Sequence, residues 1–99
     1  MEFVISGMFN PPHPGRVLKN TVCREDGGIS VTDFAKRLKV SRVALSRVLN
    51  CRAGISAALA IRLEAALGSS AQMWVGMQSA YDLWQARKKR HPKIDRLAA

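Results

Sequence analysis

The chain has 99 residues, of which 47 % are hydrophobic, so it has the size of one domain and is not composed like a disordered segment. Sixteen Lys and Arg residues against seven Asp and Glu residues give a formal net charge of +9. This imbalance favours an anionic partner, most commonly nucleic acid, although ribosomal and membrane-surface proteins share it. No run approaches the roughly 18 apolar residues of a membrane span, and the N-terminus does not resemble a signal peptide. We therefore expect a cytoplasmic protein with no membrane partner.

The cysteines and histidines do not form the pattern of a metal or catalytic site. Cys23 and Cys51 are far apart and belong to no C-x-x-C motif, so two reduced thiols are expected. His13 lies between prolines and His91 lies in a charged segment, and neither has an acidic residue at a useful spacing. We expect no enzyme activity, no metal and no cofactor.

The chain is predicted to be all-α, with five helices and no strands. Residues 1–9 are interpreted as an N-terminal arm, residues 10–88 as the helical domain and residues 89–99 as a basic tail. Asn10 to Pro14 is stiff and extended, and Pro14 suits the first turn of a helix over residues 14–23. The polar segment over residues 24–28, with two glycines, breaks the chain before the next helix.

Residues 31–50 have the pattern of two short amphipathic helices joined by a tight turn. Ser30 and Ser41 precede these helices as N-caps, and Asp33 suits a capping box with Ser30. Each helix carries an apolar stripe at the spacing of an inward face, formed by Phe34, Ala35 and Leu38 and by Leu45, Val48 and Leu49. This layout is that of a helix-turn-helix and predicts sequence-specific DNA binding.

The second helix of such a motif enters the major groove by its N-terminal end. The residues that remain outside there are Ser41, Arg42, Val43, Ser46 and Arg47. Each arginine can pair bidentately with guanine or contact only phosphate, and the sequence leaves both possibilities open. Val43 can contact a thymine methyl group, and Ser46 can act as donor or acceptor.

Residues on both sides of this helix are expected to contact phosphates. Ser30 and Thr32 can offer hydroxyl and N–H groups at the start of the first motif helix, and Asn50 and Arg52 lie beyond the second. One such module contacts too little DNA for tight binding. We therefore expect a homodimer on a palindromic operator, with half-sites about one helical turn apart.

Two further helices are predicted after the motif. The first begins after Ser56, ends at Gly68 and directs four residues inward, namely Leu59, Leu63, Ala66 and Leu67. The second covers residues 71–88 after a cap at Ser69 or Ser70, and its apolar stripe contains Trp74, Met77, Tyr81 and Trp84. This stripe is the candidate dimer interface. Packing within the same domain is the favoured alternative for Trp74 and Met77, and both alternatives remain open for Tyr81 and Trp84.

Four segments of the chain resemble the HigA-type antitoxins of the lambda-repressor-like (XRE) helix-turn-helix class. They are NPPHPGRVLKN, SRVALSRVLN, GISAALAIRLEAALGSS and MWVGMQSAYDLWQAR, and together the resemblance covers about residues 10–87. It implies an antitoxin of a bacterial type II toxin–antitoxin system, which represses its own operon as a dimer and neutralises an mRNA-cleaving, HigB-like ribonuclease toxin. The resemblance places the DNA contacts on Ser41 to Arg47, with flanking contacts around Asn50 and Arg52.

The chain departs from the family at three positions. Val43 stands where a polar residue is usual, which predicts a different operator or less stringent reading at that point. Lys39 and Cys51 stand where glycine is common, and a positive φ at either would cost about 1–2 kcal/mol. The alternative function is a free-standing phage- or plasmid-type repressor without a toxin, and an RNA-binding or scaffolding module is a further alternative.

Overall fold

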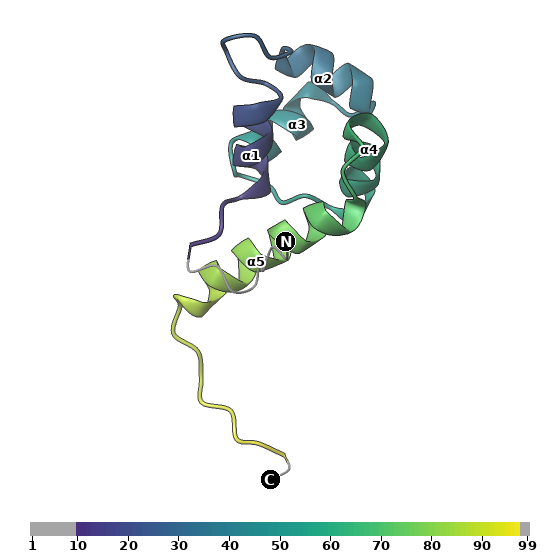
Figure 1. Cartoon of the computed structure of the whole chain (residues 1–99). Coiled ribbons are helices and arrows are strands. Elements are labelled where there is room, and N and C mark those ends of the chain that lie inside the picture. Colours follow the sequence, from purple (N-terminus) through teal and green to yellow (C-terminus); the bar gives the residue numbers. More distant parts are fainter. Residues whose placement is uncertain (1–9, 98–99) are drawn as a thin grey trace, which may run out of the picture.

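The computed structural model describes residues 10–97, so the predicted N-terminal arm lies outside the described residues. It contains five helices: α1 (Pro14–Thr21), α2 (Val31–Leu38), α3 (Arg42–Leu49), α4 (Ala57–Leu67) and α5 (Ala71–Arg87). The described residues contain no strand, which confirms the all-α prediction. Helices α1 to α4 form the body, and α5 leads away from it toward the C-terminal residues (Figure 1). No helix in this part of the chain combines the length and hydropathy needed to cross a bilayer.

Serine hydroxyl groups cap four of the five helices, as the sequence predicted. Each hydroxyl oxygen accepts a hydrogen bond from the backbone N–H three residues later, at distances of 3.0–3.1 Å, and the four caps are Ser30, Ser41, Ser56 and Ser70. Gly68 ends α4 in the left-handed region, with φ 84°. Helix α1 ends at Thr21, two residues before the predicted end, and α5 ends within one residue of its predicted end.

The cap of α1 is His13, which the sequence analysis did not predict. Its Nδ1 accepts a hydrogen bond from the Gly15 N–H at 2.9 Å. The ring is only 5 % exposed and meets the Tyr81 ring edge to face, with centroids 4.8 Å apart. His13 therefore joins the start of α1 to the middle of α5.

The core lies where α1 to α4 meet the beginning of α5. Its buried apolar residues include the predicted stripes of α2 and α3, together with Leu18, Ile55, Ala60, Leu63 and Trp74. The prediction that Ala66 and Leu67 face inward is wrong, because both are exposed and Leu67 retains 38 % of its accessible surface. Leu67 lies in the last turn of α4, beyond the packed region, and Ala66 lies on the flank of the helix.

Glycine at position 15 allows α1 to approach α3 closely. A Cβ at this position would overlap the carbonyl oxygen of Val48, which is backbone and cannot move aside by changing rotamer. Gly76, in α5, has open space around the position of a Cβ. Among the described residues, the two glycines that lie within helices therefore have opposite environments.

We predict that Gly15→Ala lowers the free energy of unfolding by about 1–3 kcal/mol, because the methyl group forces α1 away from α3. The matched control, Gly76→Ala, should raise it by about 0.5–1 kcal/mol when both variants are compared as dilute monomers, because alanine is the better helix former and a Cβ at this position meets no atom of its own chain. Urea denaturation of the two variants tests this. Equal effects of the two substitutions would contradict the proposed close approach.

Burial lowers the pKa of His13 below its ordinary value near 6.5, with Asp82 opposing and Arg16 adding to the shift. The unfolded chain therefore binds more protons than the folded chain once the pH falls below about 6.5. We predict that the contribution of His13 to the free energy of unfolding is constant above about pH 6.5 and falls as the pH is lowered below this value. His13→Asn keeps a capping group that does not titrate, so its stability should vary less between pH 7.5 and 5.5. An unchanged slope in this variant would assign the pH dependence to another group.

Candidate nucleic-acid interface

The side of α3 that faces away from the core is an open surface. Burial of Leu45, Val48 and Leu49 on one side of the helix leaves the opposite side free. The predicted reading residues lie there: Ser41, Arg42, Val43 and Arg47 are exposed, and Ser46 is half-buried. Val43 is 69 % exposed, so its methyl groups lie on the outer side of α3. The structure thus places four of the predicted residues on α3 and the fifth, Ser41, at its N-cap.

The start of α2 lies beside the start of α3. Thr32, in the first turn of α2, accepts a hydrogen bond from Nε of Arg42 at 3.0 Å. Ser30, the cap of α2, is also exposed. The two residues predicted as phosphate contacts on this flank therefore lie next to the reading residues. They lie at the N-terminal end of α2, where the helix dipole and the free N–H groups attract anions.

Asn50 lies at the other flank, directly after α3, and its amide is engaged within the chain. Nδ2 donates to the backbone oxygen of Ser46 at 2.9 Å and to its hydroxyl oxygen at 3.3 Å. Oδ1 accepts a hydrogen bond from Nζ of Lys19 at 3.3 Å. Asn50 thus links α1 to α3, a role that the sequence analysis did not foresee. Arg52 follows with an exposed side chain.

Basic residues of α1 extend this flank, and the sequence analysis missed them. Arg16, Lys19 and Asn20 line a hollow of about 270 Å³ together with Asn50 and Cys51. All three α1 residues are exposed. The available signal was the spacing of Arg16 and Lys19, which places both cations on the polar side of α1. They give the surface beside α3 further positive charge.

The two family glycine positions have left-handed backbone in this chain. Lys39 has φ 58° and Cys51 has φ 61°, so the non-glycine residues there carry strain of about 1–2 kcal/mol each. Arg62 holds the turn after α2 by donating from Nη1 to the carbonyl oxygens of Leu38 and Lys39, at 2.8 and 3.2 Å. The turn geometry that positions α3 is therefore kept without glycine.

The aromatic stripe of α5 is largely used inside its own chain. Trp74 is 4 % exposed and belongs to the core, so its prediction as a dimer contact is wrong; its own domain covers it. Met77 is partly buried and packs against the same core. Tyr81 contacts His13, and its hydroxyl oxygen accepts a hydrogen bond from Gln85 at 2.8 Å.

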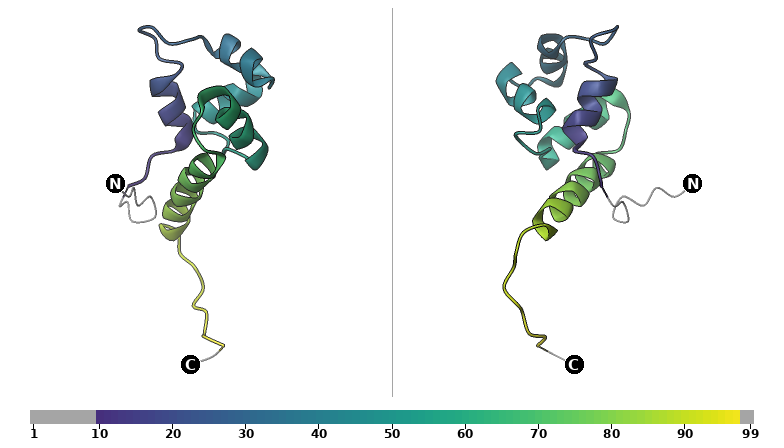
Figure 2. Two further views of the ribbon diagram at one scale, coloured as in Figure 1. Left: turned by 45° about the vertical axis from the view of Figure 1, so that its right-hand side comes forward. Right: turned by 90° about the vertical axis from the view of Figure 1, so that its left-hand side faces the viewer.

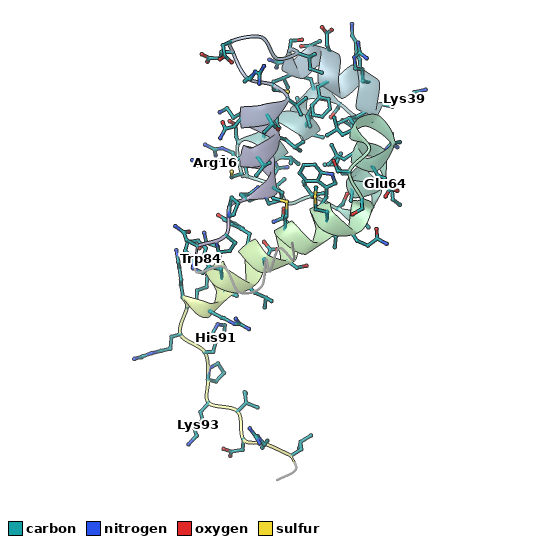
Figure 3. The ribbon with its side chains drawn as sticks, viewed as in Figure 1. Arg16, Lys39, Glu64, Trp84, His91 and Lys93 are labelled. Atoms are coloured by element: carbon teal, nitrogen blue, oxygen red, sulfur yellow. The ribbon has the colours of Figure 1, made fainter. Side chains whose placement is uncertain are left out.

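Trp84 lies farther along α5, beside the proline-rich segment that leads into α1 (Figure 3). It is half-buried, and the ammonium group of Lys88 lies 3.5 Å from the ring centroid. The basic residues beyond α5 belong to an extended segment at the far end of the molecule from α2 and α3 (Figure 2). The hollow that Trp84 lines includes Arg16 and Cys51, which border the α3 flank, whereas the extended basic segment lies away from α3.

Comparison with known proteins agrees with this geometry. Residues 23–74 match the helix-turn-helix family HTH_3. Virulence-associated protein A' of Dichelobacter nodosus is 42 % identical over 88 % of this chain and 75 % of its own length. The structure of Pseudomonas aeruginosa antitoxin HigA with the higBA promoter matches with 38 % identity and a TM-score of 0.72, covering 80 % of this chain and 85 % of that one.

A structure of antitoxin GraA in complex with its operator matches with 32 % identity and a TM-score of 0.73, covering 84 % of this chain and 82 % of that one. The chain therefore belongs to the helix-turn-helix family. Within it, the chain groups with the HigA-type antitoxins, which confirms the resemblance found in the sequence.

Proposed function

We propose that this protein is a HigA-type antitoxin that works in the cytoplasm. It binds its own operator as a sequence-specific repressor and neutralises a HigB-like, mRNA-cleaving toxin. The open, cationic side of α3, flanked at both ends by polar and basic residues, is the observation that carries the DNA-binding part. The solved structures of antitoxins with promoter or operator DNA also support the DNA-binding part of the proposal. The toxin-binding part is inferred from the family.

The surface separates into two kinds of contact. Arg42, Val43, Ser46 and Arg47 face outward on α3 and are assigned to the bases. Ser30, Thr32 and Ser41 lie at helix starts and, with Arg52 and the α1 cations, are assigned mainly to phosphates. Several phosphate contacts make the affinity fall steeply with rising salt, so affinities must be compared at one ionic strength.

We predict that Arg42→Ala and Arg47→Ala each weaken operator binding by about 1–3 kcal/mol and relax the preference at one base pair. Fluorescence anisotropy with a duplex from the protein's own promoter, and with its single-base variants, measures both effects. Arg87→Ala, at the end of α5, removes the same charge far from α3 and serves as the matched control. Unchanged affinity in both α3 variants would remove this helix from the DNA interface.

The toxin-binding part is tested separately by co-expressing this chain with its genomic neighbour. Relief of growth arrest supports the antitoxin. Operator binding without a neighbouring toxin would instead favour a free-standing repressor. The proposal gives this chain no catalytic step, because the ring of His13 serves as a helix cap and Nε2 of His91 lies 2.6 Å from the carbonyl oxygen of Ala86.

The proposed dimer uses the side of α5 that faces away from the core. Met73, Gly76, Ala80 and Leu83 follow one another at spacings of three, four and three, which is the spacing of a helix–helix seam. Leu83 is 51 % and Met73 is 37 % exposed, although both are apolar. Trp84 borders this side, so it stays in the proposal. The small Gly76 and Ala80 would allow a second α5 to approach closely.

We predict that Leu83→Glu shifts the dimer toward monomer, because two like charges would meet across the seam. Val75→Glu is the matched control, since Val75 is also apolar and 39 % exposed but lies on another side of α5. Trp84→Ala should weaken the dimer less than Leu83→Glu does. Sedimentation velocity measures all three. A dimer that survives Leu83→Glu but not Val75→Glu would place the contact elsewhere.

A further inference from the structure

Arg42 is held by a hydrogen bond from within the protein, and this restricts how it can meet a base. A guanidinium group has one N–H on Nε and four on its two Nη atoms, all in one plane. In Arg42 the Nε–H is donated to the hydroxyl oxygen of Thr32 at 3.0 Å. Only the end of the group, with its two Nη atoms, is then left to form a pair of parallel hydrogen bonds. Guanine O6 and N7 are the acceptor pair that such an end matches.

Thr32 can serve two partners at once. Its oxygen accepts from Arg42, so its own hydroxyl proton is free to be donated. Thr32 is exposed in the first turn of α2, where the positive end of the helix favours a phosphate oxygen. A phosphate bound there would accept a hydrogen bond from the Thr32 hydroxyl and fix its orientation. The oriented hydroxyl oxygen would in turn fix the position of the Arg42 guanidinium group. Phosphate binding and base reading would thus be coupled through one side chain.

We propose, on the basis of the function proposed above, that Thr32 is a positioning residue for sequence reading. It links a DNA phosphate to Arg42 and aligns the two Nη atoms of Arg42 with guanine. Thr32 therefore contributes to discrimination between bases although it touches none. This differs from an ordinary phosphate contact, which strengthens binding to every sequence equally.

The test uses the full chain and duplex DNA from its own promoter. The four variants are Thr32→Val, Thr32→Ser, Arg42→Ala and the double variant Thr32→Val with Arg42→Ala. Valine keeps the shape of threonine but lacks the hydroxyl, whereas serine keeps the hydroxyl and is the matched control. The measured quantity is the affinity ratio between guanine and the other bases at the base pair where Arg42→Ala lowers the preference most. Circular dichroism checks that each variant is folded.

Thr32→Val should lower this guanine preference by about three- to tenfold, the range expected for one hydrogen bond. Thr32→Ser should keep the preference within about twofold, since its hydroxyl can make the same bond. In the Arg42→Ala background, Thr32→Val should have no further effect on the preference, because the arginine that it positions is absent.

Two results would overturn the proposal. One is an equal loss of affinity for all sequences in Thr32→Val, which would make Thr32 a phosphate contact only. The other is the same loss of preference from Thr32→Val with and without Arg42. A wild-type protein that binds its promoter no better than random duplex would instead overturn the proposed function, and this is seen before any variant is compared.

Discussion

The DNA-reading surface depends on the burial of one side of α3. This helix has only eight residues, fewer than an isolated helix needs to persist in water, so its stability comes from packing. Leu45, Val48 and Leu49 supply that packing against α1 and α2, and Gly15 lets α1 come close enough to complete it. Because the buried side is fixed, the opposite side has only one orientation. The functional surface is therefore a consequence of the core and not a separate feature.

A second set of polar contacts fixes α5 relative to this body. The side-chain oxygen of Gln78, buried in α5, accepts a hydrogen bond from the Ile55 N–H at 2.9 Å. A carboxylate oxygen of Glu64, in α4, accepts one from the Ala71 N–H at the start of α5, also at 2.9 Å. Together with Trp74 in the core, these bonds set the direction in which α5 leaves the body. In a dimer joined through α5, that direction would set the distance between the two α3 helices and hence the half-site spacing.

The sequence predicted most of the local structure because local rules decide it. Serine caps and the apolar stripes of α2 and α3 depend on spacing alone, and the structure contains them as predicted. The sequence alone does not predict the positive φ at Lys39 and Cys51. Glycine is common in the family at both positions, but this preference does not reveal which backbone conformation another residue adopts there. Arg62 satisfies carbonyl groups at the first of these turns from α4, a contact far away in sequence.

The features that sequence reasoning missed depend on tertiary contacts. His13 is not a usual helix cap, and its ring is fixed by Tyr81, more than sixty positions later in the chain. The period of the α5 stripe predicted an apolar side correctly, but a period cannot tell whether the same chain or a partner covers it. Trp74 is covered by its own domain. The seam proposed for the partner went unnoticed because Gly76 and Ala80 carry little hydrophobic surface.

The central claim is that α3 reads the major groove with its exposed side, entering it by the N-terminal end. Dimethyl sulfate protection tests this most directly, because the reagent methylates guanine N7 in the major groove and adenine N3 in the minor groove. We expect protection of guanine N7 in two half-sites of the promoter, with one protected guanine in each half-site exposed again when the protein carries Arg42→Ala. Protection of adenine N3 alone, or of no guanine, would contradict the account.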